Sequence, residues 1–280
     1  MDRVGALPIR SLVRKEACMT FHNPLTAAWR RGQTVLGAWC TLPDPFAAEI
    51  FGRQGYDYVC IDQQHGMIDD STAFPMVQAI AASGAAPIVR VRWNEPPAIM
   101  SALDAGAMGV VVPMIETRED AAAAVSACRY PPAGLRSFGP IRARDVLGST
   151  DPDVLSDVAC IIMIETQRAL TELDEIVSTP GVDGVYIGPS DLALALGEKP
   201  GSTAPIFDET VQRIADTCRR HGVAIGMHTP TGTVARRYIE RGFDFATVFS
   251  DAGLIAAAAR EQLDLARSAS PSAAVPSGSY

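Results

Sequence analysis

Short apolar runs, often rich in β-branched residues, recur along the chain and alternate with longer stretches of helical periodicity. The apolar runs are TVLGAW, DYVCID, APIVRV, GVVVPM, ACIIMIE, GVYIG, VAIGM and FATVF, and they lie between residues 34 and 249. Near-continuous apolar runs of this length are typical of strands buried on both faces of a parallel sheet. The pattern therefore predicts eight strands.

The stretches between the strands are rich in Ala and Leu and predict helices. They are Phe46–Gln54, Ser71–Ala82, Pro96–Ala105, Thr117–Ala127, Leu170–Val177, Asp208–His221, Thr231–Arg241 and Gly253–Ala266. Several open with helix-capping residues, such as Thr117 or Asp208, and several close with glycine, at Gly55, Gly84, Gly106, Gly222 and Gly242. These signals predict one helix after each strand.

Strands alternating with helices predict an α/β protein, and eight such units predict a single (β/α)8 TIM barrel. We expect the barrel over residues 23–267, a flexible extension over 1–22 and a disordered tail over 268–280, whose composition is that of a linker. The alternative is a doubly wound open sheet. No G-x-G-x-x-G motif follows any strand, which removes the most common support for that alternative.

Composition and charge narrow the class of partner. The formal net charge of -8 is spread along the chain without a Lys/Arg block, which argues against binding to nucleic acid or to an anionic membrane. The six cysteines form no C-x-x-C pair, as expected for reduced thiols in a cytoplasmic protein. No signal peptide or membrane-spanning stretch is evident. We therefore expect a small soluble ligand.

Polar residues gather at the carboxyl ends of the predicted strands, where barrel enzymes place their active sites. Strand two ends at Asp62 and continues through Gln63 and Gln64 to His65, and strand three carries Arg90 and Arg92. Strand five ends at Glu165, strand six opens into Gly188-Pro189-Ser190-Asp191, and strands seven and eight end near His228 and Asp251. The amino-terminal ends carry mostly Gly, Ala and capping residues. This asymmetry indicates an active site.

Glu165 and Asp191 follow neighbouring strands and can converge on one point. Two converging carboxylates repel each other unless a cation lies between them, and oxygen ligands with open positions suit Mg2+, Mn2+ or Co2+. The alternative is that each is a helix N-cap or an ion-pair partner. The pair favours a divalent metal site.

An arginine inside an apolar strand needs a partner, and Arg90 near a metal could bind a substrate carboxylate or an enolate oxygen. A structural salt bridge is the alternative. Strand alternation puts Arg92 on the same face, so the choice between the two arginines stays open. His65 follows Asp62 closely enough to be oriented by it and could transfer protons, whereas the grounds for His228 are weaker.

Other catalytic templates are missing from the sequence. It contains no G-x-S-x-G elbow, P-loop, H-E-x-x-H or paired-cysteine zinc pattern. A Schiff-base mechanism needs a lysine on a strand, and Lys15 and Lys199, the two lysines, lie outside the predicted strands. The residues therefore favour polarisation of the substrate by a metal.

Seven segments resemble the HpcH/HpaI family of class II, metal-dependent pyruvate aldolases, which includes 4-hydroxy-2-oxoheptanedioate and 2-dehydro-3-deoxyglucarate aldolases. They are GAWCTLPDPFAAEI, GYDYVCIDQQHG, PIVRVRW, ALDAGAMGVVVPMIET, RYPPAGLRSFGP, MIET and GVDGVYIGPSDLALALG. The resemblance spans roughly residues 25–266, and the last segment is highly specific. It implies a lyase that reversibly cleaves a 4-hydroxy-2-oxo acid to pyruvate and an aldehyde through an enolate.

Carried over residue by residue, the resemblance implies that Glu165 and Asp191 bind the divalent metal. Arg90 would hold the keto oxygen and stabilise the enolate. His65 would transfer protons with support from Asp62 and Asp104. The turn from Gly188, with the N–H groups of Ser190 and Asp191, would bind the substrate carboxylate. The family also implies a hexamer or a trimer-based homo-oligomer in which the last helices pack on a neighbouring subunit.

Three stretches of the chain depart from the family pattern. Gln63-Gln64 replaces the usual Gly-Glu before the histidine, Met163 replaces a glutamine, and the segment after Arg136 reads SFGP. These changes bear on the substrate and the proton relay. Two alternatives to the aldolase therefore stay open: a decarboxylase of an oxaloacetate-like 2-oxo acid, and a barrel that binds 2-oxo acids without catalysis.

Overall fold

Eight parallel strands close into a barrel in the computed structural model, which describes residues 22–268. The strands are β1 (Val35–Cys40), β2 (Tyr58–Asp62), β3 (Ala86–Arg90), β4 (Gly109–Val112), β5 (Ala159–Ile164), β6 (Gly184–Ile187), β7 (Ala224–His228) and β8 (Phe245–Ser250). Each pairs with its neighbours in the sequence, and β8 pairs with β1. The predicted (β/α)8 barrel is confirmed. Apart from His22 and Ser268, the expected extension and tail lie outside the described residues.

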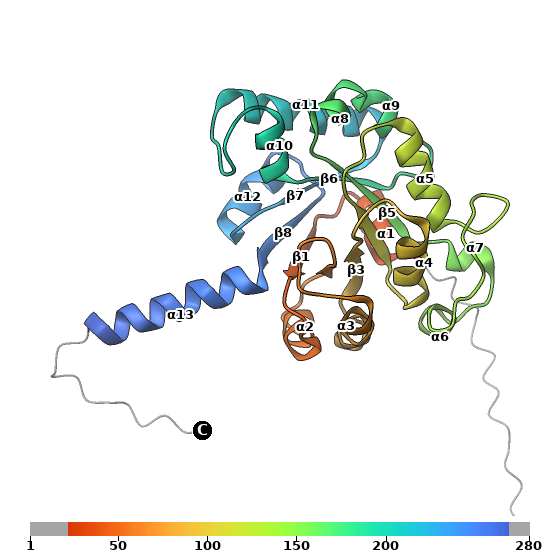
Figure 1. The fold of residues 1–280 in the computed structure, drawn as a ribbon, viewed down its shortest axis with the longest axis horizontal. Helices are drawn as coiled ribbons and strands as arrows, with labels where there is room; N and C mark the ends of the chain where they lie inside the picture. Colours follow the sequence, from red (N-terminus) through yellow and green to blue (C-terminus); the bar gives the residue numbers. More distant parts are fainter. Residues whose placement is uncertain (1–21, 269–280) are drawn as a thin grey trace, which may run out of the picture.

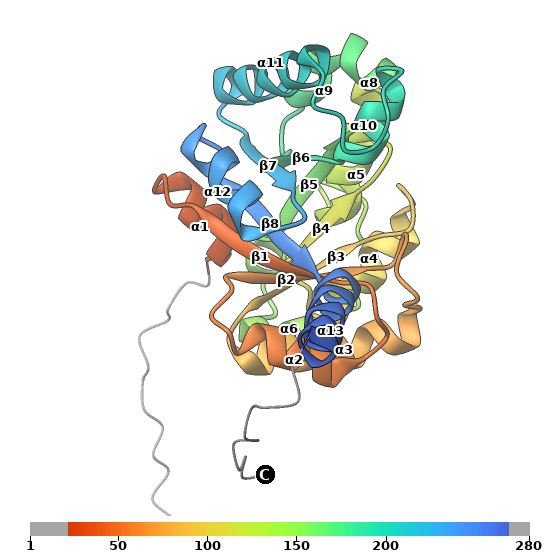
Figure 2. The same cartoon turned by 90° about the vertical axis from the view of Figure 1, so that its left-hand side faces the viewer.

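Most of the helices surround the barrel on its outer side, whereas α1 and α13 do not (Figures 1 and 2). The helices are α1 (Pro24–Arg30), α2 (Pro45–Gly52), α3 (Asp70–Ser83), α4 (Pro96–Asp104), α5 (Arg118–Cys128), α6 (Ala143–Leu147), α7 (Pro152–Leu155), α8 (Gln167–Thr171), α9 (Leu173–Val177), α10 (Pro189–Ala195), α11 (Pro205–His221), α12 (Gly232–Glu240) and α13 (Asp251–Ser268).

Most helix boundaries agree with the capping residues in the sequence. Thr117 and Asp120 form a capping box at the start of α5, and Gly84 and Gly222 end α3 and α11 in the left-handed conformation. The single helix predicted over 170–177 is wrong, because the chain forms α8 and α9 with a break at Glu172. Helix α11 begins at Pro205 rather than at Asp208, because a proline in the first turn needs no N–H partner.

Aromatic side chains fill the interior of the barrel. Trp39, Tyr58, Tyr186 and Phe245 point inward from β1, β2, β6 and β8 and are at most 2% exposed. The rings of Trp39 and Tyr186 stack at 5.5 Å, and those of Tyr186 and Phe245 at 5.7 Å. Inward-facing glycines provide the space, since a Cβ at Gly37 would lie 2.1 Å from the ring of Tyr58. The interior is therefore a packed core.

The short helix α1, which the sequence did not predict, covers the amino-terminal end of the barrel. Its Leu25 packs among the interior residues, and Trp29 lies 4.9 Å from the ring of Phe245. Asn23 is fully buried; its side-chain oxygen accepts from the N–H groups of Leu25 and Thr26, and its amide nitrogen donates to the carbonyl of Met108. The opposite, carboxyl end of the barrel stays open for a site.

Helix α13 leaves the barrel instead of packing along it (Figure 1). Leu254, Ile255, Leu263 and Leu265 on this helix are between 42% and 56% exposed. Exposed apolar side chains of this kind are typical of a surface that another protein covers. No helix among the described residues is long and apolar enough to span a membrane. The five described cysteines are free and buried.

Candidate functional site

Strand alternation carries four polar side chains to the carboxyl end of the barrel interior. In β2 the inward positions are Tyr58, Cys60 and then Asp62, and in β3 they end at Arg90. In β5 the same alternation reaches Glu165, one residue beyond the strand, and in β7 it reaches His228. Each of these residues ends an inward-facing row of apolar side chains. The barrel core thus leads directly into the candidate active site.

Asp62 and Arg90 form a buried ion pair across β2 and β3, where they are register partners. Arg90 donates from Nε at 2.8 Å and from Nη2 to the two carboxylate oxygens, and Trp39 donates its indole N–H to Oδ2 at 3.0 Å. Burial alone would raise the pKa of Asp62, but the hydrogen bonds and charge of Arg90, with the bond from Trp39, together lower it. The guanidinium therefore stays charged and fixed, with its Nη1 free of Asp62.

This ion pair settles the choice between Arg90 and Arg92. Arg90 is 9% exposed, and its guanidinium lies 5.0 Å from the Trp39 ring. Strand β3 ends at Arg90, and Arg92 turns outward, where its exposed side chain lies 4.0 Å from Asp70. Arg90 is therefore the arginine that faces the site.

Glu165 is 2% exposed, and its carboxylate is held from two sides. Oε1 accepts the backbone N–H of Met114 at 2.9 Å, and Met114 adopts the left-handed conformation with φ of 57°. On the other side, a Cβ at Gly188 would lie 2.3 Å from Oε2, so any larger residue there would force the Glu165 side chain to move. Burial raises the pKa of Glu165 to about 7, and the negative charge of Asp191 adds to this, opposed by the Met114 hydrogen bond and by Arg90.

Asp191 and Ser190 belong to the first turn of α10, which begins directly after β6. Both are exposed, and the charge of Asp191 acts on Glu165. Gly188 is the N-cap residue and offers no side-chain cap, so the first-turn N–H groups of α10 remain available to an anion. The carboxylate pair expected from the sequence therefore lies at neighbouring strand ends, one member buried and one open to solvent.

His65 lies in the loop after β2 and is exposed. Asp62 Oδ1 accepts the backbone N–H groups of Gln64 and His65 at 3.0 and 3.2 Å, so the same carboxylate that holds Arg90 also shapes this loop. Gln63 is buried and donates to Asp70 at the start of α3. Asp62 thus positions the backbone of His65 rather than its imidazole.

Two other acidic residues form hydrogen bonds elsewhere in the barrel. Asp104 ends α4 and accepts a hydrogen bond from Arg136 at 2.7 Å. Asp251 is fully buried at the end of β8 and accepts from the backbone of Thr41 and Leu42 at 2.8 and 2.9 Å. Asp251 therefore ties the loop after β1 to the start of α13.

Sequence reasoning missed Trp39 and Tyr186 at the site, noted Met163 only as a departure from the family pattern, and gave too little weight to His228. Trp39 holds Asp62, Met163 Sδ lies 4.0 Å from Arg90 Nη1, and Tyr186 contacts His228 through Nδ1 at 3.1 Å. His228 itself lies edge-on to Trp39 at 5.0 Å. The alternation of inward positions in β1, β5, β6 and β7 was the signal available for all of them.

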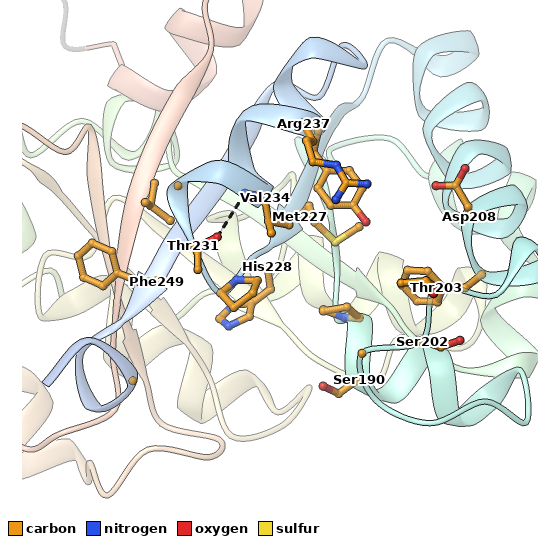
Figure 3. A pocket seen from close by; sticks show the side chains of 18 of the residues that line it. Ser190, Ser202, Thr203, Asp208, Met227, His228, Thr231, Val234, Arg237 and Phe249 are labelled. Carbon is orange, nitrogen blue, oxygen red and sulfur yellow. Dashed lines mark hydrogen bonds between the residues drawn. The ribbon is translucent and has the colours of Figure 1, made fainter. Parts of the chain in front are cut away.

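A cavity of about 1400 Å³ opens beside this centre, between α10, α11 and α12 (Figure 3). Ser190 and His228 line it on the side of the barrel, and Thr203, Asp208 and Arg237 line it farther out. Glu165 and Arg90 lie outside its lining, in the barrel mouth. The site therefore joins a small charged centre to a larger cavity.

Within residues 22–268, no cluster of three or more His, Cys, Asp or Glu side chains could hold a metal. Glu165 and Asp191 supply two carboxylates, which leaves positions open for substrate or water. Mg2+ in enzymes is often held by one or two carboxylates plus substrate. The donor set fits a hard divalent ion that shares its coordination with a ligand.

Comparison with known proteins agrees with this geometry. The family model HpcH/HpaI aldolase/citrate lyase matches residues 35–258. A hydroxypyruvate/pyruvate aldolase of Rhizorhabdus wittichii is 42% identical over 88% of this chain and 99% of its own. A 5-keto-4-deoxy-D-glucarate aldolase of Salmonella paratyphi A is 37% identical over 87% of this chain and 96% of its own.

Solved structures show the same fold. An HpcH/HpaI aldolase/citrate lyase family protein from Burkholderia cenocepacia superposes with a TM-score of 0.81 at 35% identity, over 88% of this chain and 100% of its own. The citrate synthase SbnG superposes with a TM-score of 0.79 at 28% identity, over 88% and 98%. With a family model over most of the barrel and relatives that match along nearly their whole length, this chain belongs to the HpcH/HpaI aldolase/citrate lyase family.

Proposed function

We propose that this protein is a divalent-metal-dependent carbon–carbon lyase that cleaves a 4-hydroxy-2-oxo acid to pyruvate and an aldehyde. The observation that carries the proposal is the buried Glu165 carboxylate, which lies under the influence of Asp191 and Arg90 at the mouth of the barrel. Relatives named as aldolases match over nearly their whole length. The charges of Glu165, Asp191 and Arg90 suit a lyase reaction that forms an enolate better than any other reaction.

Glu165 and Asp191 would hold the metal. Burial makes the charged form of Glu165 costly, and Asp191 adds to that cost, so a cation between them would offset both effects. When bound, Mg2+, Mn2+ or Co2+ supplies Lewis-acid polarisation of the substrate keto group. The first-turn N–H groups of Ser190 and Asp191 would bind the substrate carboxylate.

The other residues of the site act on the substrate charge and its protons. Cleavage removes the proton of the C4 hydroxyl, breaks the C3–C4 bond and leaves the electron pair on the enolate of pyruvate, which then takes up a proton at C3. Arg90 stabilises the negative charge that develops on the keto oxygen, because Asp62 holds its guanidinium in place before the reaction begins. His65, exposed beside the same pair, moves the proton.

We also propose that the protein is a homo-oligomer, hexameric or trimer-based, in which α13 packs on a neighbouring subunit. The support is the set of exposed apolar side chains on α13, a helix that lies away from its own barrel (Figure 1). Its location in the cytoplasm stays a prediction.

A direct assay tests the reaction. Incubation with Mn2+ and a panel of 4-hydroxy-2-oxo acids should release pyruvate and aldehyde in equal amounts, and a chelator should abolish release because the carboxylate pair would then hold no cation. Pyruvate is followed with a coupled dehydrogenase, the aldehyde by derivatisation and carbon dioxide in parallel. If carbon dioxide forms from an oxaloacetate-like acid and no substrate gives aldehyde, the protein is a decarboxylase. If nothing turns over while pyruvate still binds, it is a binding protein.

The pH dependence of stability tests the environment of Glu165. In the metal-free protein its pKa is raised, so protonated Glu165 contributes stability below about pH 4.5 that is lost as the pH rises through about 7. Glu165→Gln lacks this loss, so at pH 8 the variant should exceed the wild type by about 3 kcal/mol in unfolding free energy, with the gap closing towards pH 4.5. Urea denaturation in chelator measures it, and a gap that does not vary with pH contradicts the assignment.

The same Glu165→Gln variant should fail to bind Mn2+ in calorimetry, because a neutral amide is a much weaker ligand for a hard cation than a carboxylate. Normal Mn2+ affinity in this variant would contradict the metal site.

Replacement of Arg90 separates metal binding from catalysis. Arg90→Lys keeps the positive charge but loses the two-pronged bond to Asp62, so kcat should fall by about 100-fold or more while the Kd for Mn2+ stays within about threefold. Arg92→Lys, two residues along and exposed, is the matched control and should retain wild-type kcat. Equal losses in both variants would rule out a special role for Arg90.

Charge placed on α13 tests the assembly. Light scattering of the wild type should give a multiple of the chain mass of 29.7 kDa. Ile255→Asp with Leu265→Asp should lower this multiple, because burying aspartates in an apolar interface is costly. The polar control pair on the same helix, Arg260→Ala with Glu261→Ala, should leave it unchanged. A wild-type monomer would contradict the proposal.

A further inference from the structure

Three buried hydroxyl groups form a chain inside the barrel that ends at His228. The hydroxyl of Tyr58 lies 3.1 Å from Oγ1 of Thr247, which lies 2.6 Å from the hydroxyl of Tyr186. The hydroxyl of Tyr186 lies 3.1 Å from Nδ1 of His228. Tyr58, Tyr186 and Thr247 are at most 1% exposed, so water cannot replace any of these bonds without entering the core.

The number of hydroxyl hydrogens determines which group donates in each of these hydrogen bonds. Each hydroxyl has one hydrogen to donate, and Tyr58 has no hydrogen-bond partner for its hydroxyl other than Thr247 within residues 22–268. All three hydrogens find acceptors only if Tyr58 donates to Thr247, Thr247 to Tyr186 and Tyr186 to His228 Nδ1. The opposite direction leaves the Tyr58 hydrogen buried without an acceptor, at a cost of about 1–3 kcal/mol.

This direction fixes the tautomer of His228. Nδ1 accepts from Tyr186, so the proton of the neutral imidazole lies on Nε2. Burial, together with the positive charge of Arg90, lowers the pKa of His228 to about 4, and Asp62 opposes this shift only in part. The imidazole is therefore neutral near pH 7. Its Nε2–H has no acceptor among the described residues and is not enclosed by protein.

His228 lies between the charged centre and the large cavity. On one side its ring meets Trp39 edge-on at 5.0 Å, and Trp39 donates to Asp62 and lies 5.0 Å from the Arg90 guanidinium. On the other side it lines the cavity of about 1400 Å³ together with Ser190, the neighbour of Asp191 (Figure 3). A substrate held by its 2-oxo acid half at Arg90 would extend its other half past His228.

The charges of the cavity wall indicate which chemical group the aldehyde half of the substrate carries. Arg237 and Arg241 line the cavity with Asp208 and Glu240, and Arg241 already pairs with Asp208 at 2.6 Å. Two positive and two negative side chains give no net charge to select a terminal carboxylate or phosphate. A neutral N–H donor suits an uncharged oxygen better.

We propose that Nε2–H of His228 donates to a hydroxyl oxygen on the aldehyde half of the substrate, and so selects hydroxylated aldehydes over alkyl aldehydes. This inference rests on the proposed lyase function and makes His228 a specificity-determining residue. Tyr58, Thr247 and Tyr186 are positioning residues that act through it. One neutral hydrogen bond of this kind contributes about tenfold in discrimination.

The test compares two aldehydes that differ in one hydroxyl. Condensation of pyruvate with glycolaldehyde and with acetaldehyde is measured for the wild type, His228→Phe and His228→Gln. The phenyl ring keeps the contact with Trp39 but cannot donate, so the ratio of kcat/KM values should fall about tenfold. Glutamine restores an N–H donor and should recover most of the ratio. Thr203→Ala, on the far wall of the same cavity (Figure 3), should leave it unchanged.

The outcomes separate this inference from the proposed function. Exchange of the pyruvate methyl protons into deuterated buffer by the wild type tests the enolate chemistry alone, and its absence would overturn the proposed function. If exchange occurs and the aldehyde ratio is the same in the wild type and His228→Phe, the role of His228 is wrong. Equal losses with both aldehydes give that same unchanged ratio and overturn it too.

The tautomer can be measured without any activity. Solid-state 15N NMR of the full chain labelled at its four histidines should show one neutral imidazole protonated at Nε2 and not at Nδ1, missing from His228→Phe. Tyr186→Phe removes the donor to Nδ1 and should shift part of the signal to the other tautomer. A proton on Nδ1 of His228 in the wild type would overturn the proposal.

Discussion

The ion pair between Asp62 and Arg90 is the interaction on which the arrangement of the site depends. Both charges are buried where β2 and β3 end, and two buried charges are tolerated only when each satisfies the other. Asp62 accepts five hydrogen bonds, two of them from Arg90 and one from Trp39. One carboxylate therefore fixes the guanidinium, the indole and the start of the loop that carries His65.

The proposed metal-binding half of the site differs from the pair of Asp62 and Arg90, because the charge of its buried carboxylate is not neutralised by an ion pair in the described part of the chain. Within residues 22–268, Glu165 is buried with no cationic side chain in contact, and the backbone N–H of Met114 and the close approach of Gly188 hold it. Its raised pKa follows mainly from burial. An unpaired buried carboxylate is costly in the free protein, and this cost favours the binding of a cation. The barrel thus places a carboxylate paired with an arginine and a buried carboxylate with a raised pKa at the same opening.

The aromatic interior connects the stability of the barrel with the chemistry at its mouth. The rings of Trp39 and Tyr186 fill space between the strands, yet each also presents a polar atom to the site, to Asp62 and to His228. Inward glycines such as Gly37 make room for these rings. Trp39 and Tyr186 are core residues by their burial, yet they also orient the residues that face the substrate.

The sequence by itself determined the eight strands, most of the helices and the strand ends at which Asp62, Arg90, Glu165 and Asp191 lie, because apolar periodicity and capping residues are local signals. Only the tertiary structure decided that Arg90 faces inward while Arg92 turns out, that Asp104 pairs with Arg136, and that Asp251 is a structural cap. Closure of the barrel brings β1, β6, β7 and β8 together, and with them Trp39, Tyr186, His228 and Thr247. Such contacts join residues up to 189 positions apart, as in the pair Trp39 and His228, and no local pattern encodes them.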